Sequence, residues 1–245
     1  MASVSKVAGG TPALLATMEE GKLSLDDAVA LHLFNFGSKG KAAVTIRDLL
    51  THVSGLKAYE NYQTVERSRQ SGESHAQALY RHYAALPLAY PPRTKMVYSC
   101  LNLQTAAAVV QRVAGEPLEE ILRRRVWRPL GMKDTTYRPG GAQIRRCAPT
   151  GVGPDGAPIR GKVHDPLALY HGSETLCPGN AGLFSTAGDL ERYVRMILAD
   201  GVWRGKRIFR PETIRLMTTV YTPPDVKPPR SIGWAVYAEG PFAMP

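Results

Sequence analysis

The sequence predicts a helix-rich α+β fold. Amphipathic and alanine-rich segments with helical spacing recur along most of the chain. Strand signals are scarce, and the best is residues 231–238, which combine β-branched and aromatic side chains. The 245 residues are 44% hydrophobic and 21% charged, which is enough apolar material for a substantial core.

The first half of the chain contains three predicted helices. Residues 12–20 place leucines on one face and end before a glycine that suits the position after a helix. Residues 45–52 form a short amphipathic helix with Thr45 as its N-cap. The polar segment 57–75 is expected to be irregular, and residues 74–85 are expected to be helical.

The second half continues the helical pattern. Residues 102–114 are apolar and alanine-rich, which is typical of a buried helix ending at a glycine. Residues 117–125 and 211–218 each carry a proline suited to the first turn. Residues 186–199 form a further helix. The glycine- and proline-rich segment 138–162 is predicted to be a long loop.

The charge balance is basic, with 31 Lys and Arg against 21 Asp and Glu, a formal charge of +10. The densest basic run is 123–125 with Arg128. Because Glu119 and Glu120 precede it at i,i+4 spacing, we expect a solvated, ion-paired helix face. No helix-turn-helix, zinc-finger or RNA-binding signature accompanies the charge, so no nucleic-acid partner is predicted. Salt-dependent retention of DNA would indicate the opposite.

Other classes of protein are excluded by pattern. No window of 18 apolar residues predicts a membrane span, and the first ten residues lack a signal-peptide core, so the sequence leaves localisation unknown. The three cysteines are too widely spaced for a disulfide framework. Four residues of types that bind metals occur close together in the sequence: His164, Asp165, His171 and Cys177. Their spacing fits no standard zinc site, so neither a metal nor another cofactor is predicted.

Two short motifs can carry nucleophilic chemistry. Ser3 and Lys6 form an S-x-x-K tetrad, and on a helix the positions i and i+3 share one face. Lys6 could then accept the proton of the Ser3 hydroxyl. Tyr98, in Tyr98-Ser99-Cys100, could relay protons beside such a pair. Taken alone, the tetrad is common by chance, and Tyr98 equally suits the edge of a strand or loop.

Several segments, in order along the chain, resemble the serine β-lactamase-like superfamily. The similar branch contains class C β-lactamases, related carboxylesterases, D-aminopeptidases and low-molecular-weight penicillin-binding proteins. Beyond the two motifs, the matching segments are residues 18–27, 45–56 (Thr-Ile-Arg-Asp-Leu-Leu-Thr-His-Val-Ser-Gly-Leu), 113–118, 129–135, 161–166 and 179–190.

The resemblance implies a β-lactamase/transpeptidase-like fold in a single domain, residues 1–245. A helical lobe, roughly 40–150, would face an α/β lobe formed by 1–39 and 151–245. It implies acyl transfer on an ester or amide through an acyl-enzyme, without a metal. By match, Ser3 is the nucleophile, whose amide forms half of the oxyanion hole, Lys6 is its base partner and Tyr98 is the proton relay.

The sequence departs from the family pattern at two motifs. Cys100 stands where the second motif usually has Asn or Asp, and a thiol is a weak hydrogen-bond partner. This departure weighs more against β-lactam turnover than against ester hydrolysis. The third motif, a late Lys-Thr-Gly or His-x-Gly, is missing, and the strands expected before Ser3 are absent. The antiparallel sheet is therefore expected to be incomplete, with 231–238 as its one clear strand.

A local conflict concerns the first helix. Glycines at 9 and 10 each cost about 1 kcal/mol inside a helix, and an interior Pro12 about 3 kcal/mol. Thr11 and Pro12 instead suit the N-cap and first position of a new helix. Under this interpretation Ser3 and Lys6 do not share a regular helix.

Two functional hypotheses follow. The first is a serine hydrolase of esterase, β-lactamase-related or D-amino peptidase type that acts on a small ester or amide. The alternative is a truncated, catalytically impaired relative that serves as a binding module or is a gene fragment. Under the first hypothesis, a second copy of the chain could complete the sheet, because exposed strand edges invite pairing.

Overall fold

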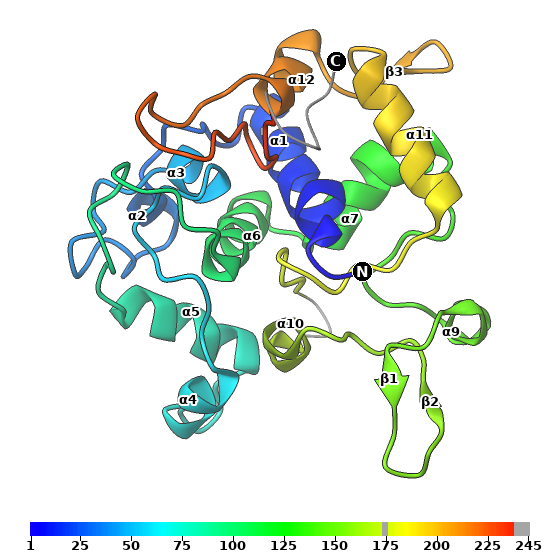
Figure 1. The fold of residues 1–245 in the computed structure, drawn as a ribbon, viewed down its shortest axis with the longest axis horizontal. Coiled ribbons are helices and arrows are strands. Elements are labelled where there is room, and N and C mark those ends of the chain that lie inside the picture. Colours follow the sequence, from blue (N-terminus) through cyan, green and yellow to red (C-terminus); the bar gives the residue numbers. More distant parts are fainter. Residues whose placement is uncertain (173–175, 238–245) are drawn as a thin grey trace.

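A computed structural model describes residues 1–172 and 176–237 of the chain. Figure 1 shows a largely helical molecule in which the N-terminal helix α1 (Thr11–Glu19) lies at the centre. It packs against α6 (Cys100–Ala114) and α7 (Leu118–Leu122). The alanine-rich sequence of α6 is buried from Leu101 to Gln111, and its small side chains allow neighbouring helices to approach closely. The helix-rich fold class is confirmed.

The helix that carries α1 begins earlier than predicted and is not broken. A π-helical turn, η1 (Lys6–Gly10), leads directly into α1, and the Thr11 N–H donates to the Lys6 carbonyl. The prediction of a fresh helix at Thr11 is therefore wrong. Packing explains both glycines: a Cβ on Gly9 would lie 2.3 Å from Tyr137 Oη, and one on Gly10 would lie 2.8 Å from the Gly179 carbonyl.

The predicted helices of the first half are present. Thr45 caps α3 through a reciprocal pair of hydrogen bonds with Asp48, and Ser74 caps α5 in the same way through Gln77. The segment 57–75 is not wholly irregular, because Asn61 caps a short helix within it. The helices are α2 (Val29–His32), α3 (Ile46–Leu50), α4 (Tyr62–Arg67) and α5 (His75–Ala85).

The second half also follows the predicted helices, with additions. After α7 the chain stays helical through a second π turn to Leu130, beyond the predicted end. The segment 138–162 is not a plain loop, since it contains a helix and a hairpin. The helices are η2 (Arg123–Trp127), α8 (Arg128–Leu130), α9 (Gly141–Arg146), α10 (Pro166–His171), α11 (Ala187–Leu198) and α12 (Pro211–Thr218).

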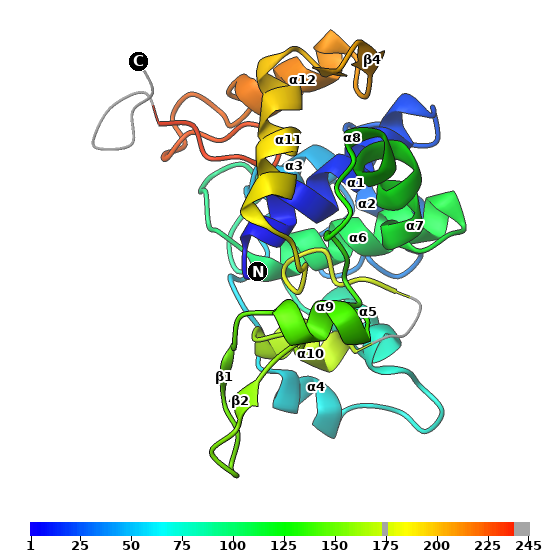
Figure 2. The same ribbon diagram turned by 90° about the vertical axis from the view of Figure 1, so that its right-hand side faces the viewer.

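The strands form two short antiparallel hairpins. In the first, β1 (Gly151–Val152) pairs with β2 (Pro158–Ile159), with Gly151 opposite Ile159. Figure 2 shows this hairpin projecting from the helical body. In the second, β3 (Val202–Trp203) pairs with β4 (Lys206–Arg207). No larger sheet is formed by the residues that the structure describes, as expected for an incomplete sheet.

The predicted strand 231–238 is wrong for the part that the structure describes, and Ala238 lies outside that part. The chain turns back on itself there, and a single bridge joins Arg230 to Ala235. Its backbone N–H groups bond to other elements: Ile232 donates to the Leu216 carbonyl and Gly233 to that of Leu50. Gly233 has a φ of +84° and lies against Thr11, so the segment lines α1 instead of a sheet.

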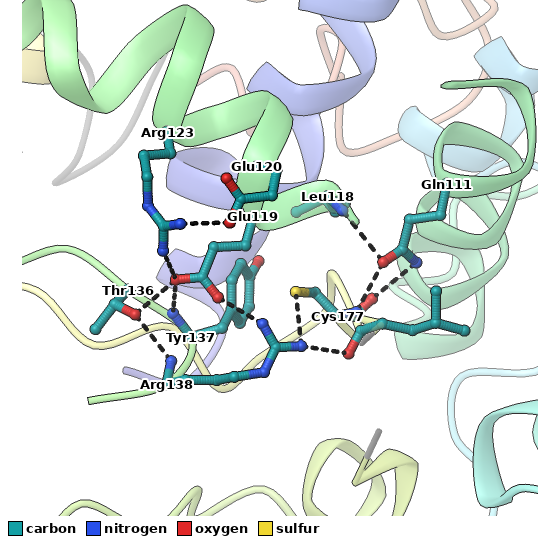
Figure 3. A network of polar contacts seen from close by, with 10 residues as sticks. Gln111, Leu118, Glu119, Glu120, Arg123, Thr136, Tyr137, Arg138 and Cys177 are labelled. Carbon is teal, nitrogen blue, oxygen red and sulfur yellow. Dashed lines mark hydrogen bonds and ion pairs between the residues drawn. The ribbon is translucent and has the colours of Figure 1, made fainter. Parts of the chain in front are cut away.

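The basic run after α7 is ion-paired, but it does not form a simple solvated face. Glu119 is buried, and its carboxylate accepts hydrogen bonds from the Thr136 hydroxyl, the Tyr137 N–H and the Arg138 guanidinium (Figure 3). Arg123 joins the same carboxylate at 3.3 Å. A residue predicted to lie on the surface therefore ties α7 to the segment 136–138.

Candidate active site

Ser3 and Lys6 lie on the first turn of the N-terminal helix, and their side chains meet. Lys6 Nζ is 3.2 Å from Ser3 Oγ, and the Lys6 N–H donates to the Ser3 carbonyl at 2.9 Å. Ser3 is exposed, whereas Lys6 is only 2% exposed. The continuous helix thus creates the S-x-x-K pair without the predicted break at Thr11.

Three further groups surround the Lys6 ammonium. The Asn180 carbonyl accepts its hydrogen bond at 2.9 Å, and the Cys100 sulfur lies 3.7 Å away. The ring centroid of Tyr98 is 4.8 Å from Nζ, within the range of a cation–π contact. Lys6 therefore joins the N-terminal helix to both the second motif and the segment around Asn180.

A buried chain of side chains fixes Asn180. Gln104 on α6 donates from Nε2 to Asn180 Oδ1 at 3.0 Å, and its own Oε1 accepts a hydrogen bond from the Tyr83 hydroxyl. Both Gln104 and Tyr83 are almost fully buried. The position of the carbonyl that holds Lys6 is thus set by helices α5 and α6. No motif in the sequence predicted this role for Gln104 or Tyr83.

Tyr98 lies just before α6 and is 40% exposed. Its backbone segment is fixed by His52, because Val97 N–H donates to the His52 carbonyl and Ser99 N–H donates to His52 Nδ1. Its ring stacks on the imidazole with centroids 4.7 Å apart. The structure thus brings Tyr98 to Lys6, and the ring face is the part of Tyr98 that contacts the ammonium.

His52 and Arg230 were not predicted as members of this cluster. Burial, with the positive charges of Arg230 and Lys6, lowers the pKa of His52 well below its usual range, so the imidazole is neutral. Because its Nδ1 accepts two hydrogen bonds, the proton is assigned to Nε2, which is buried without a partner. From the sequence, the position of His52 at the end of a helix indicated only that its side chain packs there.

Arg230 brings a second buried cation to the ring of Tyr98. Its guanidinium carbon lies 5.8 Å from the ring centroid, and the residue is 8% exposed. Burial lowers its pKa. Its guanidinium donates to the Gly233 carbonyl at 3.5 Å, and Nε has no hydrogen-bond partner within residues 1–172 and 176–237. Arg230 reaches the site because the chain turns back at Gly233, which the strand prediction did not foresee.

The cluster reaches the surface through Ser3 and Tyr98, which are both exposed. A separate pocket of roughly 250 Å³ lies beside Met1, between Thr136, Cys147 and Phe184, and none of Ser3, Lys6 or Tyr98 lines it. We therefore place the candidate site by its side-chain geometry and not by that pocket.

The four residues considered for a metal have other contacts or lie apart. Asp165 caps α10 by accepting from the Ala168 N–H at 2.8 Å, and His171 Nε2 pairs with the Tyr80 hydroxyl at 2.8 Å. Burial raises the pKa of Cys177 to about 12. Within 1–172 and 176–237 no group of three or more potential ligands is placed to hold a metal. In the same residues, no helix is both long and apolar enough to span a membrane.

An exposed serine beside a buried lysine, with a tyrosine on that lysine, is chemically suited to nucleophilic attack on a carbonyl group. The chain belongs to the β-lactamase family, whose model matches residues 1–241. The family resemblance inferred from the motifs is thereby confirmed.

Two curated relatives are named as a carboxypeptidase and as an amidase. A protein of Escherichia coli (strain K12), provisionally named as a D-alanyl-D-alanine carboxypeptidase, is 30% identical over 239 residues, covering 89% of this chain and 55% of that protein. The N-acetylmuramyl-L-alanine amidase of Bacillus subtilis (strain 168) is 28% identical over 254 residues, covering 96% and 56%. The chain thus spans about half the length of the curated relatives it matches.

A solved structure supports the fold. The octameric penicillin-binding protein homologue from Pyrococcus abyssi matches with a TM-score of 0.71 at 20% identity, covering 97% of this chain and 53% of that one. The β-lactamase/transpeptidase-like fold class is confirmed.

Proposed function

We propose that this chain is a serine hydrolase that acts on small esters or amides through an acyl-enzyme, with Ser3 as nucleophile. The observation that carries the proposal is the 3.2 Å contact between Lys6 Nζ and the exposed Ser3 hydroxyl. Family membership supports the reaction class, because named relatives are hydrolases of amide bonds.

The residues suit a two-stage reaction. With Lys6 in its neutral amine form, Ser3 Oγ attacks the carbonyl carbon while its proton passes to the lone pair of Lys6 Nζ, and the new C–O bond gives a tetrahedral oxyanion. The Ser3 N–H lies at a helix start, where backbone donors lack intrahelical acceptors, and supplies half of the oxyanion hole. Tyr98 passes the proton to the leaving alcohol or amine as its bond to carbon breaks. Water then attacks the acyl ester, and Ser3 regains its proton.

The test is covalent labelling of the folded chain with a fluorophosphonate probe or a fluorescent penicillin. We expect one adduct by intact-mass spectrometry, located on Ser3. The matched control is Ser5, two residues away, whose hydroxyl is buried between the Met1 carbonyl and the Leu183 N–H. Ser3→Ala should abolish labelling, and Ser5→Ala should retain it. Equal labelling of wild type and Ser3→Ala would contradict the proposal.

The alternative function, a binding module without turnover, makes the opposite prediction. It expects a folded chain that neither probe labels and that hydrolyses no ester. Lys6→Met and Tyr98→Phe separate the two hypotheses further. Under the hydrolase proposal, both variants bind a penicillin but acylate more slowly, by roughly 100-fold or more for loss of proton transfer.

We also infer that a second copy of the chain is the partner that extends its sheets. The two hairpins leave backbone edges without strand neighbours, and such edges favour pairing between chains. The octameric state of the Pyrococcus abyssi homologue supports assembly within this fold. Light scattering should show a dimer or larger species, whereas a monomer at high concentration would contradict the inference.

A further inference from the structure

One group of exposed cations lies together around a pocket. The arginines 123–125 each pair with glutamates. In contrast, no carboxylate among the described residues lies within ion-pair distance of Arg128, Lys133, Arg204 or Lys206. All four of these cations line one pocket of roughly 400 Å³.

The pocket is built from three parts of the chain. α8 and the turn after it supply Arg128 and Lys133, and the β3–β4 hairpin supplies Arg204 and Lys206. α11 contacts both α8 and β3 and so holds the two sides together (Figure 2). The pocket's cations therefore converge from elements far apart in sequence.

Between these two sides, the pocket wall includes Arg192 of α11, whose charge is balanced by an ion pair. Arg192 of α11 donates to the Gly131 carbonyl at 2.8 Å and to Asp189 Oδ1 at 2.7 Å. Arg204 is held on the opposite side, where its guanidinium lies 5.5 Å from the centroid of the Trp203 ring. The charge of Arg192 is thus already balanced, and the four other cations face the pocket without a counter-charge.

We propose that this pocket binds a ligand bearing a diphosphate or triphosphate group. Four uncompensated cations around one concave site favour a compact anion with several negative charges. Arginine's planar set of donors matches phosphate oxygens in pairs, and lysine adds point charge. A single carboxylate would balance only one of the four. The volume lies within the range of ordinary small-molecule sites.

The shape favours a small ligand over duplex nucleic acid. The cations surround one concave site, whereas binding to a nucleic-acid backbone is typical of a basic stripe. Trp203 is the aromatic side chain in the pocket wall, and its ring lies against the Arg204 guanidinium. This site is distinct from the Ser3 cluster, since none of Ser3, Lys6 and Tyr98 lines it.

The test is isothermal titration of the full chain with inorganic pyrophosphate and with triphosphate. We expect saturable binding of one anion per chain that weakens as salt rises. The variant Arg128→Gln/Lys206→Gln should bind at least tenfold more weakly. The matched control is Arg67→Gln/Lys95→Gln, which also removes two exposed cations outside the pocket, and it should change the dissociation constant less than twofold.

Three outcomes would overturn the proposal. One is an absence of saturable heat with either anion. Another is equal weakening in both double variants, which would show that net charge alone attracts the anion. The third is tight binding of a DNA duplex that pyrophosphate does not displace. Labelling of Ser3 by the fluorophosphonate probe reports on the other site, so failure here does not bear on the proposed hydrolase.

Discussion

The Lys6 side chain has one strong and one weak hydrogen-bond acceptor beside it. The Asn180 carbonyl is a strong acceptor at 2.9 Å, whereas the Cys100 sulfur at 3.7 Å is a weak one. A carboxamide at position 100 would offer an oxygen to Lys6 and an N–H to a substrate. The thiol therefore leaves the side of Lys6 that faces the second motif weakly held.

We predict that Cys100→Asn raises the rate of acylation by a fluorescent penicillin about tenfold, because one added hydrogen bond to a charged group contributes about 1.5 kcal/mol. Hydrolysis of a simple aryl ester should change much less. Stopped-flow labelling measures the first rate and absorbance the second. Cys100→Ala removes the thiol without adding an amide, so an equal gain in that variant would contradict the explanation.

Arg230 is the other unusual residue, a buried cation whose hydrogen bond to the Gly233 carbonyl is long. Burying a cation is costly, and replacing a buried charge by a well-packed hydrophobic side chain of similar volume is often neutral or stabilising. We predict that Arg230→Met raises the free energy of unfolding by about 1 kcal/mol or more, measured by urea denaturation. Arg210→Met, at an exposed arginine, serves as control and should change it little. A loss of stability in Arg230→Met would show that the guanidinium has a favourable partner.

At the scale of elements, the N-terminal helix shows how packing overrides helix propensity. Gly9 is unfavourable in a helix, yet a Cβ there would collide with the Tyr137 hydroxyl. We predict that Gly9→Ala destabilises the fold by about 1–3 kcal/mol, because the overpacking cost exceeds the gain in helix propensity. Thermal unfolding with denaturant titration measures the change.

The rescue of Gly9→Ala identifies the cause. The Tyr137 hydroxyl is buried and has no hydrogen-bond partner, so Tyr137→Phe should cost little by itself. The double variant Gly9→Ala/Tyr137→Phe should recover most of the lost stability. If the double variant is as unstable as Gly9→Ala, the collision is not the reason for the glycine.

Most helices could be predicted because their signals are local. Thr45 and Ser74 mark their helix starts by capping, and the apolar face of 102–114 is visible in the sequence itself. The π turn could not be predicted, since Gly10 is explained by Gly179, far away in sequence. Residues 231–237 have strand-like composition, but their backbone groups bond to Leu50 and Leu216.

The residues of the candidate site also differ in whether the sequence alone could predict them. Ser3, Lys6 and Tyr98 could be found because they occur in short motifs that resemble a known family. Arg230 and Asn180 could not, because only the tertiary fold brings them to Lys6 or Tyr98. Their sequence neighbourhoods carry no sign of that proximity.

At the scale of the whole molecule, two buried histidines make folding sensitive to acid. His171, the last residue of α10, is almost fully buried and pairs with the Tyr80 hydroxyl. Burial lowers its pKa to about 3. The pKa of His52 is lowered for the same reason. In the unfolded chain both would titrate near 6.5. As the pH falls below that value the unfolded state takes up protons that the folded state does not.

We therefore predict that the free energy of unfolding falls between pH 7 and pH 5.5, with about 1 kcal/mol of the loss due to His171. This window lies above the range in which most carboxylates titrate, so the histidines dominate the slope. His171→Gln keeps a polar partner for Tyr80 but cannot titrate, and it should lower the pH dependence by that amount. Urea titrations at each pH measure the effect, and an unchanged slope in His171→Gln would show that His171 is not the buried neutral histidine inferred from its contacts.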